Sequence, residues 1–320
     1  MGRPAKPVVC IVTPGSKEAN NGNWRTAARW AGMLRDRCKV IVQSRWDGTA
    51  ADILIALHAR RSAEAVSRYR AAHPERPVVV MLTGTDLYRD LPASREAAES
   101  LDLAGRIVVL QDDAQRLLEP RWRAKSQVIF QSARPLASQR KARGRLQCVA
   151  VGHLRPEKDP ATLFRAMSEL PRDLPIVLRH VGAPLDSALG TAARALARRE
   201  PRYKYLGALP HGPTRALIKA SHLLVHPSAM EGGANVVVEA VMSGTPVAAS
   251  RISGNVGMLG TDYAGYFEPG DASSLAVLLT QALQQPGYLR GLERQCSARR
   301  TLFAPATEAR SVRRMVAEMV

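Results

Sequence analysis

The segment 226–246 carries the side chains best suited to chemistry in this chain, because Glu231, a Gly-Gly pair and Glu239 follow one another closely. We predict a strand that ends at Ser228, a glycine loop, and a helix that begins near Asn235. Glycines let a backbone approach a ligand closely, and the first amides of a helix bind anions such as phosphate. The candidate ligand-binding residues here are Gly232, Gly233, Ala234, Asn235 and Glu239.

Glu231 and Glu239 are eight residues apart, and Glu239 lies four residues after Asn235, on the same helix face one turn further in. Ionised carboxylates accept hydrogen bonds from neighbouring hydroxyl groups. We therefore expect one of them to contact sugar hydroxyls beyond the phosphates and the other to contact ribose hydroxyls.

Short apolar runs alternate with helical patterns along the chain. Such runs, without strict alternation, are typical of strands covered on both faces, and their alternation with helices predicts an α/β fold with parallel sheets. The expected strands are 8–13, 39–44, 52–58, 77–83, 106–111, 127–131, 146–154, 175–182, 203–207, 222–228 and 246–252. The expected helices are 24–36, 61–72, 159–170, 187–199, 212–220, 235–243 and 273–285.

A polar, basic stretch at 132–145 interrupts this alternation. We interpret it as a linker between two doubly wound domains, 1–140 and 141–305; a basic surface loop inside one domain is the alternative. A length of 320 residues suits two domains. Ligands of open α/β sheets bind beyond the carboxyl ends of the strands, so two facing domains would form one cleft.

The E-x7-E spacing, continued by Ala240 and by the run 244–247 (GTPV), resembles the signature of the retaining glycosyltransferase family 4 group. The resemblance also covers the run 149–163 (VAVGHLRPEKDPATL). It implies the GT-B fold, in which two Rossmann-like domains face a cleft, with the donor nucleotide-sugar bound by the carboxyl-terminal domain.

In that family an arginine, and a lysine five residues after it, hold the donor diphosphate. Lys158 matches the lysine, whereas His153 stands at the arginine position and Arg155 is two residues away. The resemblance therefore implies Lys158, Glu231, Arg155 and His153 as catalytic residues, with His153 or Arg155 in place of the arginine. Asp159 and Thr162 indicate the start of a helix directly after this loop.

Polar motifs also follow three strands of the amino-terminal half. The first expected strand ends in the run 13–15 (TPG), where Gly15 is a further donor-binding candidate, and residues 20–27 open a helix with Asn23 as its predicted N-cap. The runs 57–62 and 82–90 end two later strands. The resemblance implies that acceptor sites are built at these positions. The acceptor-binding candidates are Asn20, Asn23, Arg25, Thr26, His58, Arg60, Arg61, Thr83, Thr85 and Asp86.

Four motifs together resemble the selenosugar synthases of selenoneine biosynthesis, a branch of family 4. They are GNWRTAARWA at 22–31, LHARRSA at 57–63, LTGTDLYRD at 82–90 and GHLRPEKDP at 152–160. This resemblance implies transfer of a sugar from UDP-N-acetylglucosamine or UDP-glucose to selenophosphate, giving a 1-selenosugar with release of UDP and phosphate. A lipid, polysaccharide or small alcohol acceptor is the alternative. We expect no cofactor and no metal.

The chain carries 46 Lys and Arg against 28 Asp and Glu, a formal charge of +18. Such an excess favours anionic partners, although genomic composition explains arginine richness equally well. Selenophosphate is an anion, and Arg25, Arg60 and Arg61 would offset its repulsion from the donor, about 4 kcal/mol for unit charges 4 Å apart at an effective dielectric constant near 20. We expect no specific nucleic-acid partner, because the sequence lacks an aromatic RNA-binding platform and a helix-turn-helix signal.

The remaining features point to a cytoplasmic protein. The four cysteines have no C-x-x-C spacing and suggest reduced thiols; no apolar run approaches the ~20 residues of a spanning helix, and we expect no secretory signal. We predict that 306–319 forms a helix that crosses back to the first domain; a basic amphipathic helix lying on a membrane is the alternative. Asp112 and Asp113 are adjacent rather than spaced D-x-D, so we expect them to cap a helix at 113–119. The oligomeric state stays open.

Overall fold

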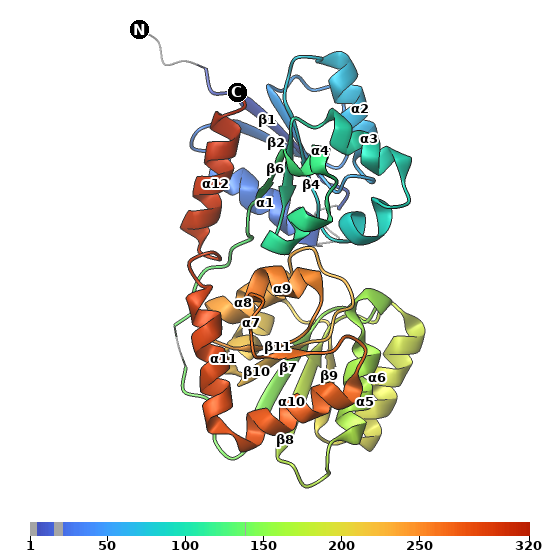
Figure 1. Cartoon of the computed structure of the whole chain (residues 1–320), viewed down its shortest axis with the longest axis vertical. Helices are drawn as coiled ribbons and strands as arrows, with labels where there is room; N and C mark the ends of the chain where they lie inside the picture. Colours follow the sequence, from blue (N-terminus) through green and yellow to red (C-terminus); the bar gives the residue numbers. More distant parts are fainter. Residues whose placement is uncertain (1–4, 16–21, 138) are drawn as a thin grey trace. The chain divides into compact units, whose positions relative to one another are not determined.

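The computed structural model describes residues 5–15, 22–137 and 139–320, which form two compact units (Figure 1). Unit 1 contains the described chain up to Gln131 together with Pro305–Val320, and unit 2 contains Ser132–Ala304. Each unit holds a six-stranded sheet, and the strand pairings within these sheets are parallel. The predicted α/β class is confirmed.

Unit 1 has the strand order β2-β1-β3-β4-β5-β6. Its central strands β3 and β4 are rich in Val, Ile and Leu and are buried from end to end, as covered parallel strands require. The strands are β1 Val8–Val12, β2 Lys39–Gln43, β3 Ile53–Leu57, β4 Val78–Met81, β5 Arg106–Val109 and β6 Ser126–Val128.

Helices cover both faces of this sheet, because successive strand side chains point to opposite sides. One core cluster joins the sheet to α2 (Ala63–Ala72) and α3 (Arg95–Leu103), and the other joins it to α1 (Gly22–Leu34) and α12 (Pro305–Ala317). The shorter elements are the π-helix η1 Asp86–Asp90, the 3-10 helix η2 Asp112–Leu117 and α4 Pro120–Arg123.

The carboxyl-terminal helix α12 belongs to unit 1 and lies beside α1 (Figure 1). Glu308 of α12 is 1% exposed; it accepts two hydrogen bonds from Arg29, at 2.8 and 3.0 Å, and one from the Trp30 indole at 2.9 Å. The apolar residues Val312 and Met315 of α12 are buried in the same core. Because its apolar face is already packed, this helix cannot insert that face into a membrane.

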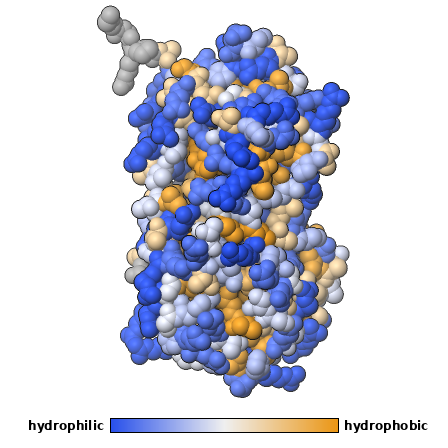
Figure 2. All heavy atoms as spheres, in the orientation of Figure 1, coloured by the Kyte–Doolittle hydropathy of each residue, from blue (hydrophilic) through white to orange (hydrophobic). Residues whose placement is uncertain are grey.

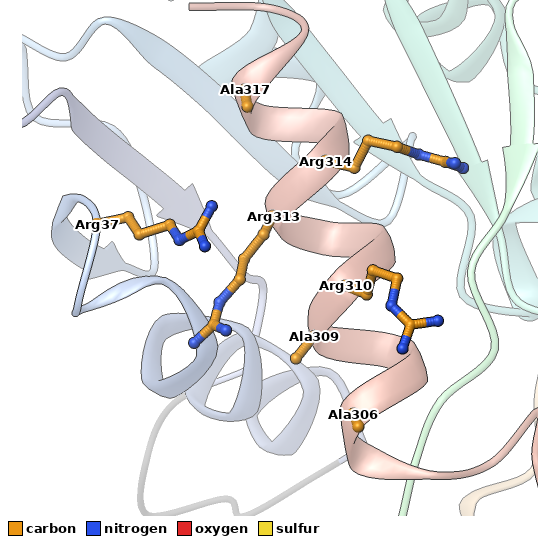
Figure 3. A pocket seen from close by; sticks show the side chains of 7 residues that line it. All are labelled: Arg37, Ala306, Ala309, Arg310, Arg313, Arg314 and Ala317. Atoms are coloured by element: carbon orange, nitrogen blue, oxygen red, sulfur yellow. The ribbon is translucent and has the colours of Figure 1, made fainter.

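The outer side of α12 borders a groove of about 410 Å³. Figure 3 shows that Arg310 and Arg314 extend from one side of the helix, whereas Arg313 extends toward the end of α1. Arg313 is tied there by Asp36 at 3.1 Å and by the Met33 carbonyl at 2.8 Å. The guanidinium groups do not converge on one point, and the lining includes none of the predicted site residues.

Unit 2 has the strand order β12-β11-β10-β7-β8-β9. Its strands are β7 Leu146–Val151, β8 Ile176–Val181, β9 Tyr203–Gly207, β10 Leu223–His226, β11 Val247–Ser250 and β12 Tyr266–Phe267. Its helices are η3 Pro156–Lys158 (a 3-10 turn), α5 Pro160–Glu169, α6 Ser187–Arg199, α7 His211–Ala220, α8 Asn235–Met242, α9 Ser253–Leu259, α10 Ala272–Gln284 and α11 Pro286–Ala298.

Aspartate side chains begin three of these helices. Asp159, Asp186 and Asp271 each accept a hydrogen bond from the amide three residues on, at the starts of α5, α6 and α10. The helix start predicted at Asp159 is thereby confirmed. On the face shown in Figure 2, hydrophilic side chains cover most of both units and hydrophobic ones appear in small groups.

The strand order reverses once in each sheet. In unit 1 the reversal lies between β1 and β3, and in unit 2 it lies between β7 and β10. Open α/β sheets bind ligands beyond the carboxyl ends of the strands at such a switch point, where the two following loops separate. We therefore expect ligands to bind at the loops after β1, β3, β7 and β10.

Some local predictions were wrong. Helix α1 already includes Gly22, so Asn23 lies in its first turn rather than at its N-cap. Gln111, not the aspartate pair, caps η2, because its side chain accepts from the Ala114 amide at 3.0 Å. Strand β10 ends at His226, two residues before Ser228. Among the described residues, no helix is both long and apolar enough to cross a membrane.

Candidate functional site

The switch point of unit 2 brings together the two loops that carry the predicted catalytic residues. The loop after β7 contains Lys158, and the loop after β10 contains Glu231. Lys158 ends the turn η3, where Asp159 has a left-handed backbone (φ 40°) that turns the chain directly into α5. The sharp turn fixes the lysine beside the strand end.

Close backbone packing holds both loops. A Cβ atom on Gly182 would come 1.9 Å from the carbonyl oxygen of Gly152, and one on Gly254 would come 1.9 Å from that of Glu231. Any larger residue at either position would displace a loop. Glycine is therefore required for the β7 loop to lie against the end of β8 and for the Glu231 loop to lie against α9.

Three ionisable side chains form a cluster at this point. Lys158 Nζ donates a hydrogen bond to Glu231 Oε1, and His226 Nε2 lies 3.2 Å from the same oxygen. The side chains of Lys158, Glu231 and His226 are 20%, 9% and 2% exposed. Two nitrogen groups thus approach one carboxylate oxygen in a nearly buried position.

The charges of this cluster depend on one another. Burial raises the pKa of Glu231, but Lys158 and His226 outweigh that effect and hold this pKa well below its usual range. Glu231 is therefore an anion at neutral pH, and it needs a cation beside it because an unpaired buried charge is costly.

Some of the backbone amides predicted to bind an anion at the start of α8 are buried or bonded within the fold. Asn235 begins this helix, as predicted, and Gly232 and Ala234 are buried. The Ala234 amide points at the Met258 sulfur, 3.2 Å away. Gly233 and Asn235 are partly exposed, so their amides are the better placed for a ligand.

Glu239 lies one helical turn further along α8 and has a partner of its own. Its Oε1 is 2.7 Å from His211 Nε2, at the start of α7. The nearby carboxylate raises the pKa of Arg215, but burial outweighs it and lowers this pKa overall. Glu239 thus sits between two basic side chains of α7.

His153 and Arg155 are the two candidates for the role of the family's arginine, and their surroundings differ. His153 is exposed and accepts a hydrogen bond through Nδ1 from the Ala183 amide at 3.0 Å. Arg155 occupies the N-cap position of η3 without a capping hydrogen bond from its side chain, and its Nε lies 3.9 Å from Glu157 Oε2. The imidazole is thus fixed by the backbone of the loop after β8, whereas the guanidinium is tied only by a long ion pair.

In unit 1, the predicted residues after β1 fall only partly within the described chain. Asn20 lies outside it, and Gly15 is buried directly after β1. Thr26 is buried in α1, donating to the Gly22 carbonyl and accepting from the Gln131 amide group, both at 3.0 Å. Its hydroxyl is therefore used within the fold, whereas Arg25 and Asn23 are partly exposed.

The loops after β3 and β4 meet at Asp86. Its carboxylate accepts hydrogen bonds from the amides of Ala59 at 3.0 Å, Thr83 at 2.7 Å and Gly84 at 2.8 Å. Asp86 is fully buried. This geometry assigns Asp86 to holding the two loops together.

His58 lies beside this carboxylate and is 1% exposed. Its backbone is left-handed (φ 76°), a conformation that costs a non-glycine residue about 1–3 kcal/mol. Nδ1 accepts from the Arg61 amide at 3.3 Å, and Nε2 lies 3.2 Å from Thr85 Oγ1. Burial lowers the pKa of His58, against the raising effect of Asp86, so the ring is neutral near pH 7.

A second carboxylate, Asp90, completes the cluster. It lies 3.0 Å from Arg60 Nε and 3.6 Å from His58 Nε2, and it is 7% exposed. Arg61 is exposed and contributes its backbone amide to the cluster. Unit 1 therefore offers arginine side chains at its surface and two carboxylates beneath them.

Three residues of these clusters were not predicted. His226 stands five positions before Glu231 at a strand end, a local signal that reasoning from the sequence could have used. Asp90 is the last residue of the motif LTGTDLYRD at 82–90, so its position there was a further signal. His211 lies 28 positions from Glu239, and no local pattern connects them. No group of three metal-ligating side chains occurs within residues 5–15, 22–137 and 139–320.

Two doubly wound units with charged loops at their switch points define a Rossmann-like, two-domain α/β protein of GT-B type. Residues 136–299, just over half of the chain, match the family described as "Glycosyl transferases group 1". The chain belongs to this family.

Solved structures of the same fold cover nearly the whole chain. Anabaena Alr3699/HepE in complex with UDP-glucose superposes with a TM-score of 0.79 at 16% identity, covering 98% of this chain and 100% of that one. Sucrose-phosphate synthase from Thermosynechococcus elongatus gives 0.78 at 18% identity, with 98% of each chain covered. A glycosyltransferase from Rickettsia africae gives 0.73 at 15% identity, again with 98% of each covered.

Proposed function

We propose that this glycosyltransferase moves a sugar from UDP-N-acetylglucosamine or UDP-glucose to selenophosphate, without a metal. The contact between Lys158 and Glu231 at the switch point of unit 2 carries the donor part of the proposal. Alr3699/HepE, which has this fold, is described with UDP-glucose. The acceptor part is supported by the resemblance of the motifs at 22–31, 57–63, 82–90 and 152–160 to selenosugar synthases.

The residues of unit 2 suit a leaving diphosphate. When the bond between the sugar carbon C1 and the UDP oxygen breaks, negative charge grows on the diphosphate. Lys158, Arg155 and the amides of Gly233 and Asn235 would stabilise that charge, and a single such donor is worth about 3 kcal/mol in the transition state. Glu231 would accept hydrogen bonds from sugar hydroxyls and Glu239 from the ribose. His153 would position the loop that carries Lys158.

Selenophosphate needs no general base, because it is already an anion with a polarisable selenium atom. Its selenium would form the bond to C1 as UDP leaves. Water would then cleave the selenium–phosphorus bond, releasing phosphate and the 1-selenosugar. Arg25, Arg60 and Arg61 would offset the repulsion between the two anionic reactants.

The test is to mix the protein with selenophosphate and each UDP-sugar, then to follow UDP release and identify the product by mass spectrometry. UDP and a selenium-containing sugar should appear together. No turnover with any UDP-sugar would contradict the proposal. Glu239→Ala should mainly raise KM for the donor, whereas Lys158→Ala and Glu231→Ala should lower kcat.

A hydroxyl acceptor is the second candidate, and the Asp90 carboxylate of unit 1 favours it. Asp90 is buried in the predicted acceptor region. A carboxylate accepts a hydrogen bond from a hydroxyl and repels a phosphate-like anion. Turnover with glycerol or a sugar alcohol that exceeds turnover with selenophosphate would support this candidate.

A further inference from the structure

We propose that His226 takes up one proton when the donor binds, and so replaces Lys158 as the counter-charge of Glu231. The inference rests on the proposed function, because it requires the diphosphate of a UDP-sugar to reach Lys158. It assigns His226 a positioning role, since the imidazole acts on Glu231 rather than on the substrate.

The first step of the argument is that Lys158 has two tasks. In the structure its Nζ donates a hydrogen bond to Glu231 Oε1. In the proposed reaction the same ammonium group must neutralise the diphosphate. A lysine donates from a single compact charge, so binding of the donor weakens the pairing with Glu231.

The second step is that Glu231 cannot lose its counter-charge without replacement. Its side chain is 9% exposed, and Gly254 packs its backbone directly against the Glu231 carbonyl. An ionised carboxylate left unpaired in such a place is strongly destabilised. Glu231 must also stay ionised to accept hydrogen bonds from the sugar.

The third step is that His226 is in position to supply the charge. Its Nε2 is buried and lies 3.2 Å from Glu231 Oε1, close enough for an imidazole N–H to donate to that oxygen. A cavity of about 10 Å³ adjoins His226 and Lys158. Histidine is the side chain that gains a proton most readily near neutral pH.

The neighbouring groups single out this histidine. Lys158 shares the cavity with the ring from the turn after β7, and Glu231 faces the ring from the loop after β10. From β8, His180 lines the same cavity. Burial lowers the pKa of His180 to about 4, so His180 stays neutral at the pH of the experiment. The proton comes from the buffer, and the imidazole becomes an imidazolium with N–H groups on both nitrogens.

The experiment is calorimetric titration with UDP-glucose, and in parallel with UDP-N-acetylglucosamine, at pH 8 in buffers that differ in ionisation enthalpy. The phosphodiester groups of these ligands do not titrate near this pH. The dependence of the measured heat on the buffer gives the number of protons taken up. We expect net uptake approaching one proton, and a Kd that weakens by up to about tenfold per pH unit as the pH rises from 7 to 9.

Two variants complete the test. His226→Gln should bind the donor with no proton uptake and a flat pH dependence. His222→Gln, near the start of the same strand, should behave as the wild type.

The two possible failures are distinguishable. If the wild type binds neither UDP-sugar, the proposed function fails, and this inference fails with it. If the wild type binds without proton uptake, or if His226→Gln binds with undiminished uptake, the role of His226 is overturned and the proposed function stands.

Discussion

Each unit buries a carboxylate beside the ends of its central strands, but the two carboxylates are held in different ways. Asp86 of unit 1 accepts from three backbone amides, whereas Glu231 of unit 2 is paired with the side chains of Lys158 and His226. Amides cannot leave without unfolding a loop, but side chains exchange partners. The comparison assigns Asp86 to maintaining the structure, and it supports the proposal that Glu231 belongs to a ligand-binding site that rearranges.

The largest expected effect is on turnover after a change in unit 2. Lys158→Met should lower kcat/KM about 10²–10³-fold, because one well-placed donor to developing charge is worth about that much. Initial rates of UDP release with the preferred acceptor measure it. Lys204→Met, which alters an exposed lysine on β9, is the matched control and should retain wild-type kinetics. Equal kinetics of the two variants would remove Lys158 from the site.

The next effect is on stability after a change in unit 1. Asp86→Ala leaves the amides of Ala59, Thr83 and Gly84 buried without their acceptor, and we expect the free energy of unfolding to fall by about 3 kcal/mol. Urea unfolding followed by circular dichroism measures the loss. The exposed carboxylate Glu75 provides the control, because Glu75→Ala should change little. A wild-type stability with a large rise in KM would instead make Asp86 a ligand-binding residue.

A smaller effect should decide between the two acceptor classes. Asp90→Asn removes one negative charge beside Arg60 while keeping the shape of the side chain. If the acceptor is selenophosphate, its KM should fall by about five- to tenfold, a change of about 1 kcal/mol. If the acceptor is an alcohol, the same variant should lose turnover. Comparing KM for both acceptors in wild type and variant separates these outcomes, with thermal melting as the check on folding.

Most of the fold was predictable from local patterns. The buried runs of β3 and β4 contain almost nothing but Val, Ile and Leu, and Asp159 lies three residues before the amide that it caps. Strand ends were less predictable: β10 stops at His226, directly before Pro227, whereas we expected it to end at Ser228. Beyond His226 the chain leaves the sheet and contacts the loop after β7, where the Ala229 amide donates to the Glu157 carbonyl at 3.0 Å.

The candidate site was predictable only where its residues are close in sequence. The glycine loop and the two glutamates lie within one segment, and the resemblance connected Lys158 to them. The pairing of Glu239 with His211 depends on how α7 packs against α8. The hydrogen bond from the Ala59 amide to Asp86 joins two loops through residues 27 positions apart. Such contacts follow from tertiary packing, so no single stretch of sequence encodes them.

The smallest expected effect concerns acid stability and again separates the two kinds of carboxylate. The folded state holds the pKa of Glu231 below its ordinary value of 4.5, so unfolding takes up a proton as the pH falls below that value. The stability from this pair is therefore complete above pH 4.5 and is lost progressively at lower pH, by at most about 1.4 kcal/mol per pH unit. Glu231→Gln should have a shallower decline between pH 4.5 and pH 3 in urea unfolding, whereas Glu268→Gln, an exposed carboxylate of the same unit, should keep the wild-type slope. If both variants decline as the wild type does, the pairing with Lys158 and His226 contributes no stability, and Glu231 is as loosely held as a surface glutamate.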